Sequence, residues 1–491
     1  MVPRALRRAG RALQRRVHTN GVTRRVGIDP RTLAAFRIAL GAVLLVDLWL
    51  RWGDLVAFYT DDGVFPRDAL AAEFPTFAWL SIHAVSGDAW VQALLFVVAA
   101  VFALALLVGY HTTLATAGSW VLLASLQARN PLVLNGGDTM LALTLLLAIF
   151  LPLGDRWSID AQAVEPDRRP IRPVFTLAST AILLQVVVIY LTNAVLKLRG
   201  DRWLAGDAIE YAFELEQFTV PMGDLVAGQT ALLTAATWAW LGLLLASPLL
   251  LLSTGRLRIA LVGAFVGAHA GMGLTMRLGV FPLISITLLL PFLPGTVWKP
   301  VGLSRLGRKL ERIDGPEIER GGVDARGVRR RCQPLASVIV VAVVAVLFAW
   351  NAAALGLVDA PDGAGVDPEE QRWDMFAPDP PGTDVTYVAP ATLDSGVEVD
   401  AFRPEAERVD RPPDDGAYPT ARWRKFLVSQ WATDGPDADH LAEYLCWRAG
   451  DRHGDVERVA VEYVERDVQP GGTPSDETTR SGLLVERSCD G

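Results

Sequence analysis

The sequence predicts an all-α polytopic membrane helix bundle of about nine transmembrane helices, followed by a small C-terminal extracytoplasmic domain that contains β-strands. Three observations carry this prediction. The chain is 51% hydrophobic over 491 residues, and its apolar residues gather in runs long enough to cross a bilayer. Basic residues recur in every second connection between these runs. Beyond residue 357 the chain turns acidic and rich in proline and glycine.

Residues 1–27 form a polar, arginine-rich segment, which we predict to be a cytoplasmic N-terminus. This segment is similar to the start of a signal peptide. The apolar run that follows is long and lacks a small-residue cleavage site, so we expect an uncleaved first helix instead.

The membrane domain is predicted over residues 28–300, with about eight transmembrane helices. A basic cytoplasmic linker is expected over 301–334, and the last transmembrane helix over 335–357. The helices are expected at Leu33–Leu50, Ala89–Gly109, Thr112–Gln127, Asp138–Leu153, Val174–Leu196, Gln229–Ser253, Leu257–Met276, Gly279–Leu293 and Leu335–Leu357.

The distribution of basic residues gives an orientation. If the helices alternate in direction, four basic segments fall on one side, which is the cytoplasmic side by the positive-inside rule. They are Arg4 to Arg25, Arg156 to Arg172, Arg256 with Arg258, and Lys299 to Arg331. We therefore predict a multi-pass protein that lies in the lipid bilayer of the cell membrane. Its N-terminus would be cytoplasmic, and its segment 358–491 would be extracytoplasmic.

The segment 358–491 is predicted to form a small folded domain with strands at Thr386–Val388 and Val459–Val464. Cys446 and Cys489 both lie in it, in a compartment where a disulfide would persist. A disulfide and two free thiols fit the sequence equally well. Cys332 lies on the cytoplasmic flank and is expected to be inert.

The composition excludes some classes of function. A net charge of −8 points away from nucleic acid. The six histidines are scattered without zinc-like spacing, and the three cysteines form no CxxC pair, so no metal is expected. The acidic, arginine-rich and lysine-poor composition is similar to that of halophilic or high-GC prokaryotes.

A lysine ends the apolar run Val174–Leu196. A charge costs about 2.5–3.5 kcal/mol at mid-membrane and less near the edge. Arginine supplies most positive charge in this chain, but lysine can give up its proton, so Lys197 is a candidate base. Lipid and Trp203 would favour its neutral amine, whereas a nearby Asp201 or Asp138 would hold the charge. The alternative is a helix-end lysine whose ammonium reaches the interface.

A second polar cluster runs from Asn135 through two glycines to Asp138. The glycines allow a tight turn, and Asp138 would lie at the start of a helix. Asp138 is therefore either part of a helix cap or a functional carboxylate.

Two further segments carry candidate residues. His269 lies in an apolar helix among small residues, and it is either a hydrogen-bonded structural residue or a functional one. Trp373, Met375 and Phe376 follow the last predicted helix closely. We expect this segment to dock back onto the membrane domain or to line a pocket between the two domains.

Taken in order, these segments resemble the HTTM (horizontally transferred transmembrane domain) family, the membrane domain shared with vitamin K-dependent gamma-carboxylase. The resemblance covers residues 28–300 and the segment around Trp373. It rests on Arg37, Tyr59–Pro66, Asn135–Asp138, Leu151–Gly154 with Ser158–Asp160, Tyr190–Gly206, Gly279–Pro282 and Trp373–Phe376.

The resemblance implies a chemistry. In the carboxylase, the lysine that matches Lys197 deprotonates a reduced quinone, which then reacts with oxygen and yields an epoxide and a stronger base. That base removes a proton from a glutamate side chain, and the carbanion takes up carbon dioxide, a lyase reaction. Lys197 would thus be the base, with vitamin K or menaquinone as the cofactor and a peptide or protein substrate on the outer face. The pocket candidates are Asn135, Asp138, Trp203, His269, Trp373, Met375 and Phe376.

Three alternatives stand beside a quinone-dependent, carboxylase-like epoxidase. The first is a non-catalytic membrane partner, such as a maturation or immunity factor of a secreted peptide. The second is a lipid-linked glycosyltransferase that binds a metal at Asp61 and Asp62. The third is a transporter, although the sequence shows no inverted repeat.

Overall fold

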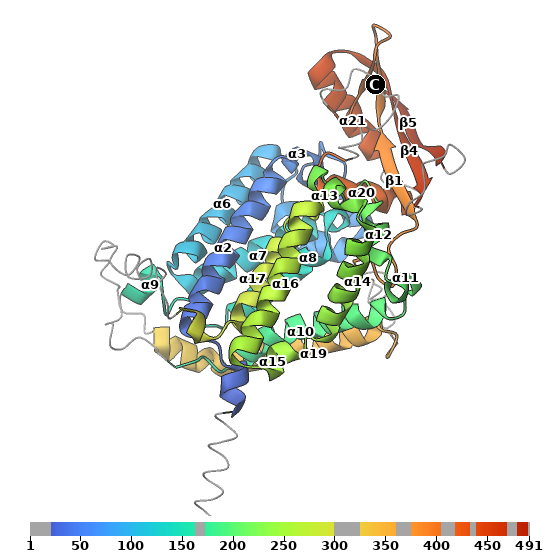
Figure 1. The fold of residues 1–491 in the computed structure, drawn as a ribbon. Helices are drawn as coiled ribbons and strands as arrows, with labels where there is room; N and C mark the ends of the chain where they lie inside the picture. Colours follow the sequence, from blue (N-terminus) through green and yellow to red (C-terminus); the bar gives the residue numbers. More distant parts are fainter. Residues whose placement is uncertain are drawn as a thin grey trace, which may run out of the picture.

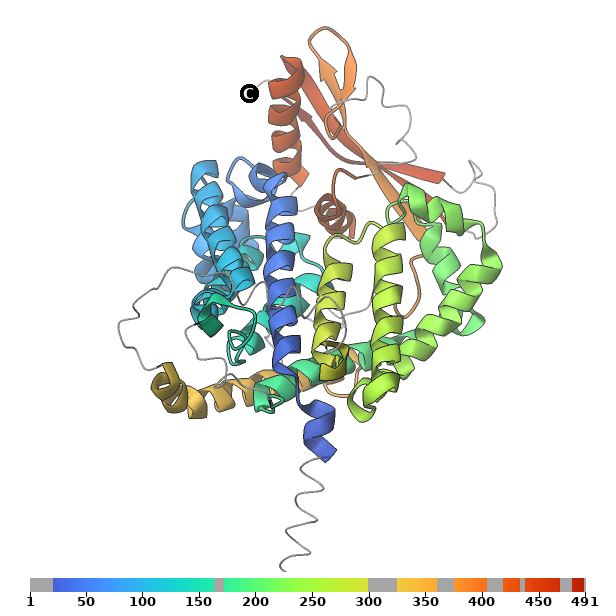
Figure 2. The ribbon, with the colours of Figure 1, turned by 60° about the vertical axis from the view of Figure 1, so that its left-hand side comes forward.

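The computed structural model describes residues 21–162, 172–298, 325–359, 375–403, 418–432, 438–468 and 479–489. Long helices form a bundle, and a small domain of strands and helices stands at one end of it (Figures 1 and 2). The predicted class, a helical membrane-type bundle with a small C-terminal domain that contains strands, is confirmed at this level.

The bundle consists of long helices joined by short ones. The long helices are α2 (Pro30–Trp52), α6 (Ala89–Val108), α7 (Thr112–Arg129), α8 (Gly136–Ala148), α10 (Leu177–Lys197), α14 (Thr230–Leu245), α16 (Gly255–Thr275) and α19 (Ala325–Ala354). The short ones are α3 (Leu55–Tyr59), α4 (Arg67–Glu73), α5 (Pro75–Leu80), η1 (Ile82–Ala84), η2 (Pro131–Val133), α9 (Ile159–Gln162), α11 (Asp201–Ala205), α12 (Ala208–Phe213), α13 (Pro221–Ala227), α15 (Leu249–Leu252), α17 (Phe281–Leu289), η4 (Leu290–Phe292) and η5 (Gly295–Trp298). α10 and α19 pack side by side and cross the other long helices (Figure 2).

Five helices of the described residues are long and apolar enough to cross a membrane: α2, α6, α10, α16 and the stretch Pro334–Ala354 of α19. A sixth span arises if α13 and α14, which meet at a bend of 101°, count as one. α8 has only 13 residues, fewer than the roughly 20 that a span needs. These helices indicate an integral membrane protein. The count of nine spans, the orientation and the cell membrane stay predictions.

The largest differences from the predicted helix bounds are found in two helices. The run predicted at Gln229–Ser253 is not continuous, because α14 ends at Leu245 and α15 begins at Leu249. Pro248 lies in between and cannot donate the backbone hydrogen bond that a continuing helix needs. The last helix, α19, begins at Ala325, before the predicted start at Leu335.

The C-terminal domain holds an antiparallel sheet and two helices. β4 (Val456–Asp467) pairs with β1 (Thr383–Val388), β2 (Pro390–Leu393) and β5 (Thr479–Ser488), while β3 (Glu398–Asp400) pairs with β2. The helices are α20 (Ala421–Ala432) and α21 (Ala438–His453). The two predicted strands lie within β1 and β4, whereas the sequence did not predict the helices.

Cys446 of α21 and Cys489 after β5 form a disulfide across a sequence separation of 43 residues. This bond decides between the two alternatives that the sequence left open. The side chain of Cys332 lies outside the described part of the chain.

The C-terminal domain shares a hydrophobic core with the bundle. The ring centroid of Phe58, on α3, lies 4.9 Å from that of Trp423 and 5.9 Å from that of Phe426, both on α20. All three side chains are fully buried. α20 is therefore seated on one end of the bundle, and burial of these rings stabilises the contact by about 1.5–3 kcal/mol for each side chain.

Candidate functional site

Lys197 ends α10 and is only 2% exposed. Its Nζ donates a hydrogen bond to the carbonyl of Met375 at 2.7 Å and to that of Phe376 at 3.2 Å. The Nζ atom also lies 4.1 Å from the ring centroid of Trp203. The candidate base is thus buried between backbone oxygens and an aromatic face, a place where a cation is well stabilised.

Trp203, on α11, holds the same segment from a second side. Its Nε1 donates to the carbonyl of Phe376 at 2.7 Å, so one carbonyl accepts from both Trp203 and Lys197. Phe376 has a φ of +58°, a backbone conformation that is uncommon for a residue with a side chain. The surrounding contacts therefore determine the position of this carbonyl.

The segment after Phe376 docks onto the turn between α10 and α11. The carboxylate of Asp379 accepts hydrogen bonds from the backbone N–H groups of Asp201 at 3.1 Å and Arg202 at 3.0 Å. A Cβ atom on Gly200 would lie 2.0 Å from the carbonyl oxygen of Pro378, so only glycine fits there. The predicted docking onto the membrane domain is found for residues 375–380. Trp373 lies outside the described residues.

His269 lies in α16 and is 1% exposed. Its Nε2 is 2.9 Å from the hydroxyl of Tyr190, while its Nδ1 has no hydrogen-bond partner in the described part of the chain. Aromatic rings surround the pair. Phe265 stacks on Tyr190 with their ring centroids 4.5 Å apart, and Trp240 meets the imidazole edge-on with the ring centroids 5.5 Å apart. Phe281 lies 5.9 Å from the imidazole. An unpaired buried nitrogen is costly, which makes Nδ1 a ready partner for a ligand.

Tyr190 and Lys197 are seven residues apart on α10. Seven residues make about two helical turns, so both side chains lie on one face, separated by about 10 Å along the axis. We call Tyr190, His269 and Lys197 the polar stripe. The sequence singled out two of its members, and the structure adds Tyr190 as the hydrogen-bond partner of His269.

Asn135 and Asp138 form a capping box at the start of α8. The Asn135 side chain accepts from the N–H of Gly137 at 2.8 Å, and the Asp138 carboxylate accepts from the N–H of Asn135 at 2.9 Å. The helix cap, one of the two alternatives that the sequence left open, is therefore present, with Asn135 as the N-cap residue.

Asp138 also belongs to a buried group of four charges. Arg51 donates to Asp138 at 2.6 Å and to Asp47 at 2.7 Å. Arg422, from α20, lies 2.8 Å from Asp47 and 3.3 Å from Asp138. Each of the four is at most 8% exposed. We call these residues the charged cluster. The partners of Asp138 are thus two arginines, and not Lys197 as the sequence had left open.

The sequence analysis missed three members of the charged cluster. Asp47 and Arg51 stand four residues apart in an apolar helix, a spacing that brings side chains together on one face. Charged residues inside such a helix signal a buried partner, so this signal was available. Arg422 gave no signal, because it lies in a helix that the sequence did not predict.

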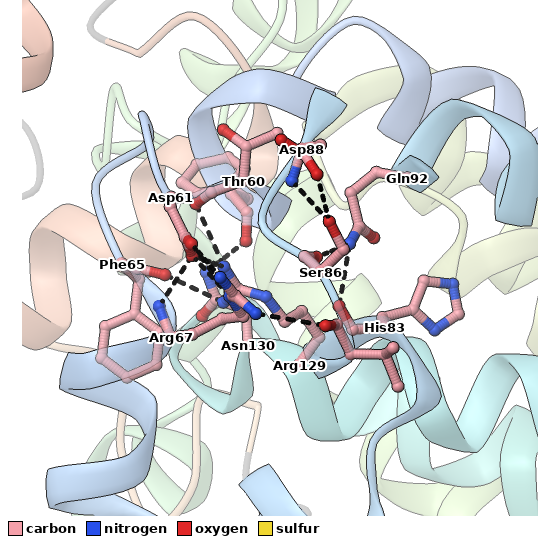
Figure 3. A network of polar contacts seen from close by, with 12 residues as sticks. Thr60, Asp61, Phe65, Arg67, His83, Ser86, Asp88, Gln92, Arg129 and Asn130 are labelled. Atoms are coloured by element: carbon pink, nitrogen blue, oxygen red, sulfur yellow. Dashed lines mark hydrogen bonds and ion pairs between the residues drawn. The ribbon is translucent and has the colours of Figure 1, made fainter. Parts of the chain in front are cut away.

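Arg129 organises the loop after α3, as Figure 3 shows. It donates to the carbonyl of Thr60 at 3.0 Å and to that of Phe65 at 2.9 Å. Asp61 of this loop accepts from Arg67 at 2.6 Å, so an arginine already occupies its carboxylate. Among the described residues, no cluster of His, Cys, Asp or Glu has an arrangement that would hold a metal ion. The glycosyltransferase hypothesis thus has no support from Asp61.

Next to this loop, Gln92 donates to the carbonyls of His83 at 2.8 Å and Ser86 at 2.6 Å (Figure 3). The Nδ1 of His83 lies 2.7 Å from the hydroxyl of Ser125. Burial lowers the pKa of His83 to about 3, so its imidazole stays neutral. We assign this network to the support of the loop.

The segment Leu151–Asp160, part of the resemblance, has a structural role at the other end of the bundle. Asp160 accepts from the N–H and the hydroxyl of Thr112 at 2.8 and 2.7 Å, which satisfies the start of α7. Arg37 is fully buried and donates to the carbonyl of Trp157. These contacts tie the segment to α2 and α7.

Comparison with known proteins gives one match. A family model described as HTTM domain matches residues 26–297, which is more than half of the chain. No curated protein matches the sequence. No solved structure matches it either.

Proposed function

The chain belongs to the HTTM domain family, and from this premise we propose that it is a quinone-dependent membrane enzyme in which Lys197 is the base. The observation that carries the proposal is the polar stripe, a buried amine two turns from a buried phenol–imidazole pair with an unpaired nitrogen. A ligand that carries two oxygens on an apolar ring has polar atoms that could bond to these polar groups.

The surroundings support an apolar aromatic ligand. The rings of Trp240, Phe265 and Phe281 all lie within about 6 Å of the Tyr190–His269 pair and offer faces and edges for stacking. The Nδ1 atom of His269 has no partner among the residues that the structure describes, and it would accept from, or donate to, an oxygen of the ring. These features fit a reduced quinone, which when bound supplies the reaction with oxygen.

Lys197 would remove a proton from a phenolic hydroxyl and become an ammonium. The carbonyls of Met375 and Phe376 and the ring face of Trp203 then stabilise the charge formed on Nζ. The 2% exposure of Lys197 limits competition from water. The residues around Nζ thus stabilise the product of the proton transfer. The acceptor would be a peptide or protein on the side of the C-terminal domain.

The same contacts favour a second candidate function, that of a non-catalytic membrane partner of a secreted peptide. In this case Lys197 is a latch that holds residues 375–380 against α11, since its two hydrogen bonds go to backbone carbonyls of that segment. The buried amine then stabilises the domain contact and carries out no chemistry.

The first experiment measures epoxide formation from reduced menaquinone and reduced vitamin K by the purified full chain. We expect turnover by the wild type and none by Lys197→Ala. Lys425→Ala, which removes an exposed lysine of α20, serves as the matched control and should keep the activity. Absence of turnover in a well-folded wild type would overturn the enzyme proposal in favour of the latch.

A further inference from the structure

The start of α16 holds a buried arginine that has no described ion pair. Arg258 is 4% exposed, and its Nε and Nη2 have no hydrogen-bond partner among the described residues. Its guanidinium carbon lies 5.4 Å from the ring centroid of Phe292. In the part of the chain that the structure describes, no carboxylate pairs with it. α15, which directly precedes α16, lies at the end of the bundle opposite the C-terminal domain (Figure 1).

A buried guanidinium without an acceptor is unfavourable. Burying a charge costs several kcal/mol unless an opposite charge and hydrogen bonds compensate for it. Arginine does not escape this cost by losing its proton. The buried Arg51 shows how this protein compensates such a charge elsewhere, since two carboxylates lie against it. Among the described residues, Arg258 has the ring of Phe292 beside it and no carboxylate.

Other features at this place also favour an anion. Thr254, the N-cap residue of α16, makes no side-chain capping bond, so the cap leaves the first-turn N–H groups to another acceptor. Arg258 lies in the first turns of this helix, where side chains lean back toward the N-terminus. Arg256 is exposed in the first turn, and Arg25 donates to the carbonyl of Leu252 at 3.0 Å close by. The dipole of α16 and the nearby arginines thus give this place a positive electrostatic potential.

We propose that this place, formed by Arg258, Arg256 and the first turn of α16, binds the phosphate of an anionic phospholipid. The shared chemistry is that of a phosphate anion. The lipid source is favoured by apolar side chains that flank the arginines and remain exposed: Leu249 at 41%, Leu252 at 62% and Leu257 at 56%. Acyl chains would cover these leucines while the headgroup reaches the arginines. The site is independent of the quinone chemistry.

The test titrates the purified full chain in neutral detergent with phosphatidylglycerol or phosphatidylcholine, and follows bound lipid by native mass spectrometry and the melting temperature by fluorescence. We expect phosphatidylglycerol to bind and to raise the melting temperature of the wild type, with phosphatidylcholine having little effect. Arg258→Gln should weaken phosphatidylglycerol binding about tenfold, or about 1.4 kcal/mol.

Controls separate this site from a general charge effect. Arg487→Gln removes an exposed arginine of the C-terminal domain and should leave binding unchanged. If Arg258→Gln fails to fold, Arg258→Lys tests the same point, because it keeps the charge and loses the planar fork. Equal lipid binding by wild type and Arg258 variants would overturn the proposal. Inorganic phosphate that raises the melting temperature as strongly as the lipid would overturn the lipid assignment.

Discussion

The charged cluster and the polar stripe are both buried in the same bundle, but they are satisfied in different ways. In the charged cluster, two arginines meet two carboxylates. In the polar stripe, none of the described residues pairs with the Nδ1 of His269. A closed set of charges fixes the positions of the elements that carry it, whereas an unpaired polar atom offers a hydrogen bond to a ligand. We therefore assign domain docking to the cluster, whereas the chemistry of the stripe is the proposal that the experiments below test.

The largest expected effect comes from breaking the charged cluster. Arg422→Ala leaves Asp47 and Asp138 with a single arginine, and should lower the free energy of unfolding by about 3–5 kcal/mol. Thermal unfolding in detergent measures this loss. Arg487→Ala, which removes an exposed ion pair in the same domain, should cost at most about 1 kcal/mol.

A double variant sharpens this test. Adding Asp47→Asn to Arg422→Ala balances the charges again, so part of the lost stability should return. If Arg422→Ala costs no more than Arg487→Ala, the cluster does not hold the two domains together.

The second prediction concerns a substitution that displaces the segment over Lys197 and leaves the residues of the polar stripe unchanged. Gly200→Ala places a Cβ atom 2.0 Å from Pro378 O and 2.4 Å from Asp379 Oδ1, so the segment has to shift. We expect a loss of about 1–3 kcal/mol and a lower rate of any reaction that depends on Lys197. Gly228→Ala is the control, since among the described residues no atom beyond its chain neighbours lies within 4 Å of its Cβ position. Equal rates for both variants would show that the segment does not contribute to the site.

The third prediction concerns a carboxylate that is only partly compensated. Asp384 on β1 accepts from Gln217 at 2.9 Å and lies 3.6 Å from Arg466, and burial raises its pKa to about 6. The folded state then holds the proton more tightly than the unfolded state, in which the pKa is about 3.9. Stability is thus greatest at low pH and is lost as the pH rises through about 6.

From pH 5 to pH 7.5 this group should reduce the free energy of unfolding by about 1–2 kcal/mol. Melting temperatures across this range measure the effect. Asp384→Asn should flatten the dependence, with Asp394→Asn, on an exposed turn, as the control. An unchanged slope in Asp384→Asn would assign the pH dependence to other groups.

The smallest effect comes from the polar stripe itself. Tyr190→Phe removes the hydroxyl that bonds His269, and should cost about 0.5–1.5 kcal/mol in stability. Its effect on quinone turnover should be larger than its effect on folding, because His269 loses its orientation. Unfolding and turnover of Tyr190→Phe are measured together, with His269→Phe as a second variant. A loss of turnover that only follows the loss of folded protein would assign the pair to structure.

The sequence predicted the elements whose signals are local. Long apolar runs identified α6 and α16 closely, and the glycine turn before Asp138 indicated a helix start. The docking of Met375 and Phe376 was also predictable, because exposed apolar residues next to a membrane domain favour contact with it.

Contacts between distant segments were not predictable. Arg422 reaches Asp47 across 375 positions of sequence, and Tyr190 meets His269 across 79. The spacing of apolar residues indicates which face of a helix or strand is buried, but not which distant residue packs against that face. Such pairs therefore cannot be predicted from the spacing. The same holds for α20, whose two arginines and one lysine weaken the apolar pattern of its buried face.

The late position of Arg422 in the sequence also has a consequence during synthesis of the protein. Asp47, Arg51 and Asp138 leave the ribosome long before residue 422, and together they carry one excess negative charge. Until α20 is synthesised and seated, these two carboxylates therefore share a single arginine. A chain truncated before α20 would keep this defect permanently, which gives cellular proteases a way to distinguish an unfinished chain from a complete one.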